Sequence, residues 1–542
     1  MRRVLAASDD GTALAASTPA DPGQTMRDEG SSSSRRAILY GALAAASARI
    51  VGAALVRFLG FRAVSDDDFA RVVIAQRFAA SPHLDPSGTS WLPLPFWLVG
   101  GAMTLLGPSL EVARVLAWSG AAIFGALVAA IAIASGVAPR RAIAASIVAA
   151  AMPWGMQLAV ATVPEAPAAA CAAAGAIALS STSSRIRVVG ALALLSSCWS
   201  RYDAWPIAAA FAALCLVDAR RAAGADRIRL AVAAAIAIAG PLSWTSWQAI
   251  VYHDPFRYLR LVRSYRQALG PGPSIGQRLL GYPAGLFEEM REVIGAAIVG
   301  ASAWTVVRRR AWQEASAIAR RWQRPLLVAL LQVAVLVAGD VRDGAPTHHP
   351  ERALLGPATI VLFASGDAIG AWISVAKSAV ARALIVVFCV ASLAGYISLR
   401  LQRSLPWYSS APRARELAAG RALSRANAEG ASILIDTRDL DGGYLDYGYY
   451  ALLAAYGRPN DAVVDRDQDP RHVRGPSSFE TPQSLRARVS EANARVLLAW
   501  GPRHRAVAES IGARLIEEEN PAAAADPEAY RWAIFALDDA RP

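Results

Sequence analysis

Long apolar runs separated by short arginine clusters are the feature that most restricts how this chain folds. A straight helix needs about 20 apolar residues to cross a bilayer. Eleven runs approach that length, and the shorter ones need flanking residues to complete a span. They lie at 37–60, 112–136, 141–160, 164–181, 186–200, 204–219, 228–250, 292–307, 325–340, 353–374 and 381–399. With 54% hydrophobic residues among 542, the sequence predicts a polytopic α-helical membrane protein with about eleven transmembrane helices.

Arginine placement predicts the orientation of these spans. Arg35 and Arg36 precede the first run, and cytoplasmic loops carry the excess of positive charge, so the N-terminus is expected in the cytoplasm. The arginine-rich short loops all fall on that same side if residues 91–107 do not cross. Pro93 and Pro95 favour this reading, because proline interrupts helices. We therefore predict a multi-pass protein of a bacterial inner membrane, with the outer loop 61–111 and the C-terminal region outside the cytoplasm.

Composition excludes several other classes of protein. The net charge of +12 comes from arginines grouped between apolar runs, not from a basic stripe with interleaved aromatics, so we expect no nucleic-acid partner. The four cysteines lie in apolar runs without metal-ligand spacing and are expected to be small buried residues.

The two ends of the chain differ from its middle. Residues 1–34 are polar and poor in aromatics, which predicts a disordered cytoplasmic tail, and Met26 offers an alternative start. Residues 35–400 form the predicted membrane domain. In 401–542, short apolar runs alternate with helical stretches, which predicts a small extracytoplasmic α/β domain.

Asp66, Asp67 and Asp68 directly follow the first apolar run. Charge beside a bilayer is costly unless water, a cation or a partner accompanies it, so the triplet is a candidate catalytic site. The alternative is structural: Ser65 or Asp66 caps a helix from Phe69 to Ala80, and its dipole favours acids there. The two roles are compatible.

Other outer loops carry further polar motifs. The segment SDDDFARVVIAQRFAASPHLDPSGTSWLPLPFW begins at Ser65, VPEAP occupies 163–167, YHDPFRYL occupies 252–259, and HHPERALLGP occupies 348–357. Taken in this order, they resemble the glycosyltransferase C (GT-C) superfamily over roughly residues 37–400. In that superfamily an outer-loop acidic pair is followed by an aromatic, a juxtamembrane helix and a proline-rich segment. His253 replaces the glycine of the usual Gly-Asp-Pro loop.

The resemblance implies an inverting transferase, of the protein mannosyltransferase or aminoarabinose transferase kind. Such an enzyme moves a sugar from a polyprenyl-phosphate carrier to a hydroxyl of a glycan, lipid or protein acceptor. Spacing to Phe69 allows either Asp66-Asp67 or Asp67-Asp68 to be the family's pair, and Asp67 belongs to both. A carboxylate that takes the acceptor's proton contributes about 10² to 10⁴ in rate. Three adjacent acids also repel one another, which makes a divalent cation one candidate partner.

Substrate-binding candidates share the outer side. Arg352 is the first choice for the departing phosphate, because guanidinium binds phosphate bidentately; alternatively it is an interfacial residue paired with Glu351. The other candidates are His349, Glu165, Arg201, Asp203 and Arg257. Each has an alternative role. Glu165 caps a helix or contacts the acceptor, Arg201 and Asp203 form an ion pair, and Arg257 binds ordinary lipid headgroups.

A metal site at His348, His349 and Glu351 is disfavoured but stays open, because two adjacent histidines do not readily share one helical face and a third separated ligand is missing. Two other functions stay open: a transporter or flippase of lipid-linked sugars, and a non-catalytic membrane scaffold. Many transporters are built from internal repeats, and this sequence shows none, which argues against the transporter.

Overall fold

The computed structural model describes residues 22–537. It leaves out 269–271, 343–349, 377, 381, 384–385, 388–389, 392–393, 396, 400–412, 428, 438–446, 470, 473–474 and 520–530, and for residues 22–34 and 350 it describes the backbone alone. His348 and His349 therefore lie outside the described residues, as does most of the tail expected over 1–34. Residues 22–34 prolong the first helix, which begins before Arg35.

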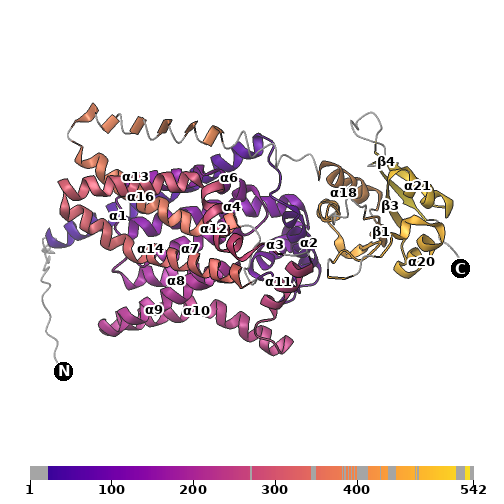
Figure 1. Ribbon diagram of the computed structural model, residues 1–542, viewed down its shortest axis with the longest axis horizontal. Helices are drawn as coiled ribbons and strands as arrows, with labels where there is room; N and C mark the ends of the chain where they lie inside the picture. Colours follow the sequence, from indigo (N-terminus) through magenta and orange to yellow (C-terminus); the bar gives the residue numbers. More distant parts are fainter. Residues whose placement is uncertain are drawn as a thin grey trace, which may run out of the picture.

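A helical bundle forms the larger part of the molecule (Figure 1). Its helices are α1 (Pro22–Phe58), α4 (Leu110–Ala134), α5 (Pro139–Ala151), α6 (Pro153–Val160), α7 (Glu165–Ala178), α8 (Ser184–Cys198), α9 (Trp205–Arg221), α10 (Gly224–Tyr252), α12 (Ile275–Glu289), α13 (Arg291–Arg310), α14 (Trp312–Val341) and α16 (Leu355–Val375). The loops between them contain α2 (Asp66–Ala80), α3 (Leu94–Leu106), the 3-10 turn η1 (Tyr202–Ala204), α11 (Arg257–Ala268) and α15 (Pro350–Ala353).

Six described helices are long and apolar enough to cross a membrane, or eight spans if α5 with α6 and α12 with α13 each count as one bent span. The sequence predicted eleven. The difference lies in α7 and α8, which have 14 and 15 residues, and in the run 381–399, which is only partly described. The break between α5 and α6 falls at Pro153, because a residue before proline avoids the helical conformation.

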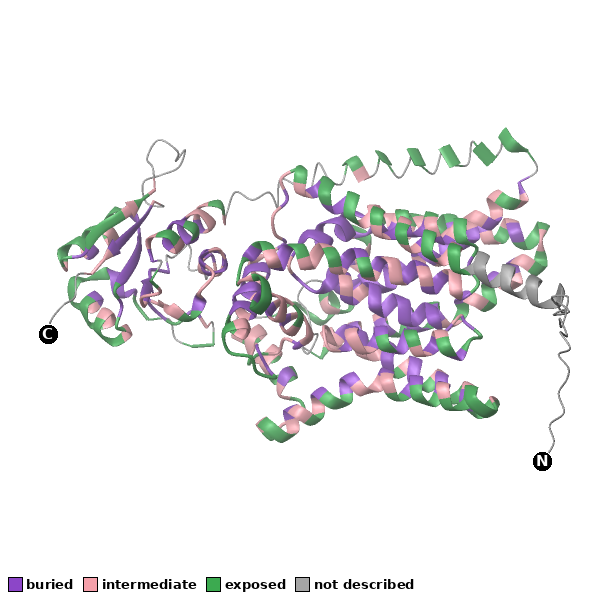
Figure 2. Ribbon diagram, turned by 180° about the vertical axis from the view of Figure 1, so that it is seen from behind, coloured by how far each residue is buried: buried purple, intermediate pink, exposed green. Residues whose placement is uncertain are grey.

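The surface of the bundle is apolar, as contact with lipid requires. Leu242, Ile298 and Leu330 are 58%, 63% and 66% exposed. Buried residues gather in the inner helices, and exposed ones cover the outer faces (Figure 2). Helix α7 is buried almost throughout and consists mainly of alanine. Such small side chains let neighbouring helices approach closely, and a Cβ on its Gly175 would lie 2.3 Å from the side chain of Leu194.

The arginine-rich loops meet at one end of the bundle. The buried Asp367 accepts hydrogen bonds from Arg141, Arg321 and Trp322, and Asp218 pairs with Arg187 and Arg324. The other end of the bundle, called the acidic end below, carries Asp66 to Asp68, which follow the last turn of α1, and Glu165, which begins α7. Arg187 donates to the carbonyl of Leu179 at the far end of α7. The arginine-rich loops therefore share one end of the bundle, as their placement in the sequence predicted.

Helix α3 begins and ends near the acidic end, as expected for a segment that does not cross. At its start, Leu94 N–H donates to the carbonyl of Trp199, 3.1 Å away. Just after its end, the carbonyl of Pro108 accepts from Gln76 of α2 at 3.1 Å.

The C-terminal part is a small α/β domain beyond the acidic end of the bundle (Figure 1). Its elements are α18 (Ala414–Ala426), β1 (Ile433–Ile435), α19 (Tyr449–Tyr456), η3 (Pro459–Asp461), β2 (Ala462–Val464), η4 (Ser478–Glu480), α20 (Pro482–Ala492), β3 (Val496–Trp500), α21 (Gly501–Ser510), β4 (Arg514–Glu518) and β5 (Trp532–Ala536). The strand order is β2-β1-β3-β5-β4. Strands β2, β1 and β3 are parallel, and β5 is antiparallel to both β3 and β4.

This domain and the outer loop share one hydrophobic core. Phe69, Val72 and Val73 of α2 belong to the same buried cluster as Leu423 of α18 and Leu452 of α19. Gln76 of α2 is 2% exposed and donates to the carbonyl of Ala454 at 2.9 Å. The domain is thus packed directly on the helix that carries the aspartates.

Candidate functional site

The three aspartates occupy the first turn of α2. Ser65 is the N-cap residue in an extended conformation, and Asp66, Asp67 and Asp68 follow it. Acidic residues stabilise this position because the helix dipole is positive there. Successive residues of a helix point about 100° apart, so the three carboxylates face different surroundings.

Asp68 acts as a structural anchor. It is 2% exposed, and one carboxylate oxygen accepts from the backbone N–H groups of Val64 and Ser65, at 3.0 and 3.2 Å. The other oxygen accepts from Thr162 N–H at 2.9 Å. Burial raises the pKa of Asp68 to about 6, against the effect of these hydrogen bonds and of Arg352. Of the two caps considered from the sequence, Ser65 is the N-cap residue, and Asp68, the third residue of the helix, accepts from the Ser65 backbone N–H.

Asp66 is engaged with the C-terminal domain. Arg413, the residue before α18, donates from Nε and Nη2 to the two carboxylate oxygens, both at 2.8 Å. This bidentate geometry is the strongest form of arginine–carboxylate contact.

Asp67 is the most accessible of the three. Its side chain is 44% exposed, against 3% for its partner Arg352. The guanidinium of Arg352 lies 3.4 Å from the Asp67 carboxylate and 3.2 Å from the Ser65 hydroxyl. Arg352 is thus a buried residue at the site and does not extend along the bilayer surface.

Behind Asp67 lies a buried charged cluster. Arg201 donates to Glu165 at 2.6 Å and to Asp203 at 3.0 Å, and Arg352 comes within 3.9 Å of Glu165. Arg71, one turn after Asp67, stacks its guanidinium on Trp91 with 4.2 Å to the ring centre. The structure therefore brings together five of the predicted residues: Asp67, Glu165, Arg201, Asp203 and Arg352.

Three buried polar atoms of this cluster have no hydrogen-bond partner among the described residues. They are Oε2 of Glu165, Nε of Arg352 and Nε of Arg71. Buried polar atoms without partners are rare and costly. Two of the three are arginine donors, so the cluster suits an anionic ligand with further hydrogen-bonding groups.

The remaining predicted residues have other surroundings. Arg257 donates to the carbonyl of Gly88 at 3.1 Å and stacks on Tyr252, which ties α11 to the outer loop. Glu351 precedes Arg352 and is 8% exposed. His349 lies outside the described residues.

The aspartate triplet does not converge on one point. Asp66 is bound to Arg413, and Asp68 is bound to backbone N–H groups, so a divalent cation would have Asp67 alone as a ready ligand. Among the described residues, no group of three or more acidic, histidine or cysteine side chains could hold a metal ion.

Arg71 and Arg413 are not among the site residues predicted from the sequence. Arg71 follows Asp67 by four residues on the same helix, a spacing that places both side chains on one face. This spacing could have indicated Arg71 as a site residue. Arg413 lies 347 residues from Asp66, and no local pattern indicates such a contact.

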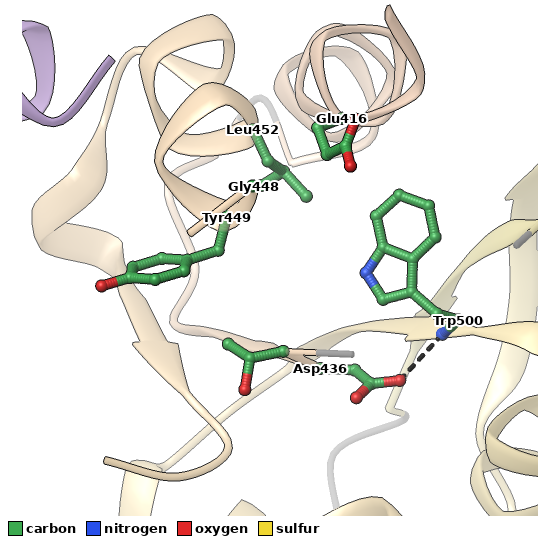
Figure 3. A pocket seen from close by; sticks show the side chains of 7 residues that line it. Glu416, Asp436, Gly448, Tyr449, Leu452 and Trp500 are labelled. Atoms are coloured by element: carbon green, nitrogen blue, oxygen red, sulfur yellow. Dashed lines mark hydrogen bonds between the residues drawn. The ribbon is translucent and has the colours of Figure 1, made fainter. Parts of the chain in front are cut away.

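A separate small cavity lies inside the C-terminal domain (Figure 3). Glu416 of α18, Tyr449 of α19, and Asp436 and Trp500 at the carboxyl ends of β1 and β3 line it. Asp436 accepts from Trp500 N–H at 2.9 Å. With a volume of about 10 Å³, the cavity holds about one water molecule and is too small for a sugar.

These observations define a polytopic membrane protein whose charged site lies between the helical bundle and a small α/β domain. The fold is shared with solved GT-C glycosyltransferases, so the resemblance noted in the first outer loop is confirmed at the level of the fold.

The similarity is to ArnT from Cupriavidus metallidurans. Its apo structure is 12% identical with a TM-score of 0.50, and its structure bound to undecaprenyl phosphate is 13% identical with a TM-score of 0.50. Each match covers 90% of this chain and 97% of ArnT. An Archaeoglobus fulgidus oligosaccharyltransferase tethered to an acceptor peptide matches at 14% identity and a TM-score of 0.46, over 86% of this chain and 69% of that protein. No protein-family model and no curated protein sequence matches the chain.

Proposed function

We propose that this protein is an inverting glycosyltransferase that moves a sugar from a polyprenyl-phosphate carrier to a hydroxyl acceptor at the outer membrane face. Two things support the proposal. The fold is that of ArnT, which has a structure with bound undecaprenyl phosphate, and the charged cluster has the groups that such a transfer needs.

Asp67 is the proposed general base, and its accessibility is the observation that carries the proposal. Its two neighbours are committed to Arg413 and to backbone N–H groups, whereas Asp67 is 44% exposed. In the reaction, the acceptor oxygen attacks the anomeric carbon, and the bond from that carbon to the phosphate oxygen breaks. Asp67 takes the hydroxyl proton, which keeps positive charge from building up on the attacking oxygen.

Arg352 and Arg71 are the proposed phosphate ligands. The departing phosphate gains negative charge, and fixed guanidinium groups in a buried site stabilise that charge without having to reorganise. The unpaired Nε atoms of both residues support this role. Glu165 is 2% exposed and its Oε1 is bound to Arg201, so we assign it to the orientation of these arginines.

The proposed orientation has the N-terminus in the cytoplasm and the C-terminal domain outside. It rests on the arginine-rich end of the bundle, which holds Arg141, Arg187, Arg321 and Arg324, and on the preference of such residues for the cytoplasmic side. Single cysteines at positions 140 and 425 test it. We expect a membrane-impermeant thiol reagent to label only position 425 in intact cells, and the reverse would overturn the orientation.

The test of function uses membranes that contain the protein, incubated with a panel of labelled polyprenyl-phosphate sugars. We expect one donor to give labelled product, and Asp67→Asn to lower transfer by about 10² to 10⁴. Glu111→Gln is the matched control, because Glu111 also lies in the first turn of a helix and is 69% exposed. It should transfer at the normal rate.

Two results contradict the proposal. Near-normal transfer by Asp67→Asn would refute the role of Asp67. Absence of product from every donor would refute the glycosyltransferase, and movement of an intact labelled donor across the membrane would then identify a transporter.

A further inference from the structure

The ion pair between Asp66 and Arg413 joins the outer loop to the C-terminal domain. Both carboxylate oxygens and two guanidinium nitrogens take part, at 2.8 Å each. Both side chains are largely shielded, with 28% of Asp66 and 18% of Arg413 exposed. A shielded bidentate contact fixes the direction of both groups, which a single solvent-exposed contact does not.

Arg413 is itself held in place by its own domain. Its Nη1 donates to Glu416, which is 2% exposed, at 3.3 Å. Helix α18 lies close against α19, since a Cβ added to Gly420 would be 2.2 Å from the carbonyl of Leu452. Helix α19 in turn contacts α2 through Gln76 and the shared core. The Arg413 guanidinium is therefore held in place by Glu416 and by the packing of α18, α19 and α2.

Asp67 lies between two fixed neighbours. Asp68 ties the turn to Thr162, in the connection between α6 and α7, and Asp66 ties it to Arg413. The backbone of the turn is therefore held from two sides, and the direction of the Asp67 side chain toward Arg352 follows from both attachments. Arg413 also neutralises the carboxylate next to Asp67, which limits repulsion within the triplet.

The geometry points to Arg413 as a positioning residue: the C-terminal domain holds the first turn of α2 so that Asp67 faces Arg352. This inference rests on the proposed function for its catalytic consequence, and it gives the C-terminal domain a direct part in the reaction. Arg413 itself touches neither the reacting hydroxyl nor the phosphate.

The test compares full-length Arg413→Ala, Asp66→Ala and the charge exchange Asp66→Arg with Arg413→Asp. Arg425→Ala is the control, because Arg425 lies on α18, the helix that Arg413 precedes, and pairs with Glu517 inside the domain. Two kinds of measurement are made: hydrogen exchange of the first-turn amides of α2, and steady-state kinetics (kcat and KM) with the donor found active in the panel. Thermal unfolding confirms that each variant is folded.

We expect Arg413→Ala and Asp66→Ala to speed exchange in the first turn of α2 and to lower kcat by about 10- to 100-fold with KM nearly unchanged, because small misplacements of a catalytic group have such effects. The charge exchange should restore slow exchange and part of kcat, and Arg425→Ala should match the wild type.

Unchanged exchange and unchanged kcat in Arg413→Ala would overturn the inference, and so would a charge exchange that restores neither in a folded protein. Hydrogen exchange needs no substrate. If no donor is active, the proposed function fails while the exchange data still decide whether Arg413 holds the turn.

Discussion

The buried carboxyl of Asp68 predicts how stability depends on pH. Burial raises its pKa from 3.8 to about 6 in the folded protein, while the unfolded chain keeps the ordinary value. The folded state therefore binds the proton more tightly. This contribution to stability is fully present below about pH 3.8 and is lost as the pH rises through about 6.

The size of this effect follows from the shift. A difference of about two units, at 1.36 kcal/mol per unit, gives about 3 kcal/mol between pH 3 and pH 7. Asp68→Asn and Asp68→Ala lack the titrating group. Relative to either variant, the wild type should therefore lose about 3 kcal/mol over this range, with a slope near 1.4 kcal/mol per pH unit between the two pKa values.

The assay is denaturant or thermal unfolding of the purified protein in detergent at several pH values. The two variants should differ from each other by a constant offset, because Asp68→Ala leaves the N–H groups of Val64, Ser65 and Thr162 without an acceptor and Asp68→Asn keeps one carbonyl. Equal stability differences from the wild type at every pH would refute the reasoning, and so would a wild type that gains stability relative to the variants as the pH rises.

Two further predictions concern the site and its support. Arg352→Lys keeps the charge but cannot reach Asp67 and Ser65 with separate nitrogens, so we expect the Kd for the proposed polyprenyl-phosphate carrier to rise about tenfold. An unchanged Kd in a direct binding measurement would remove Arg352 from the proposed phosphate site. Gln76→Ala leaves the buried carbonyl of Ala454 without its donor, which should cost about 1 to 3 kcal/mol. Protease resistance of the C-terminal domain equal to that of the wild type would contradict this.

Local patterns account for what the sequence predicted well. The apolar runs predicted the membrane bundle, and the arginine clusters predicted which loops share an end. The sequence predicted the unequal roles of the three aspartates only in part. The spacing to Phe69 singled out Asp67, but which neighbour serves as the anchor depends on Thr162 and Arg413. Those contacts are set by tertiary packing, and no local pattern in the sequence indicates them.

The number of spans shows a different limit of the sequence. Hydropathy treats 164–181 and 186–200 like other runs, yet α7 and α8 are short helices rich in small residues and are packed among other helices. A window average cannot distinguish apolarity that faces lipid from apolarity that faces protein, because both exclude charge.

The hydrophobic core shared by α2 and the C-terminal domain sets an order for biogenesis. Helix α2 is synthesised more than 300 residues before α18 and α19. Phe69, Val72 and Val73 therefore lack their final packing partners while the rest of the bundle is inserted. The contacts that complete the site then form last, at a large separation along the chain, which slows assembly. A chain interrupted before its last domain would therefore be inserted in the membrane but inactive.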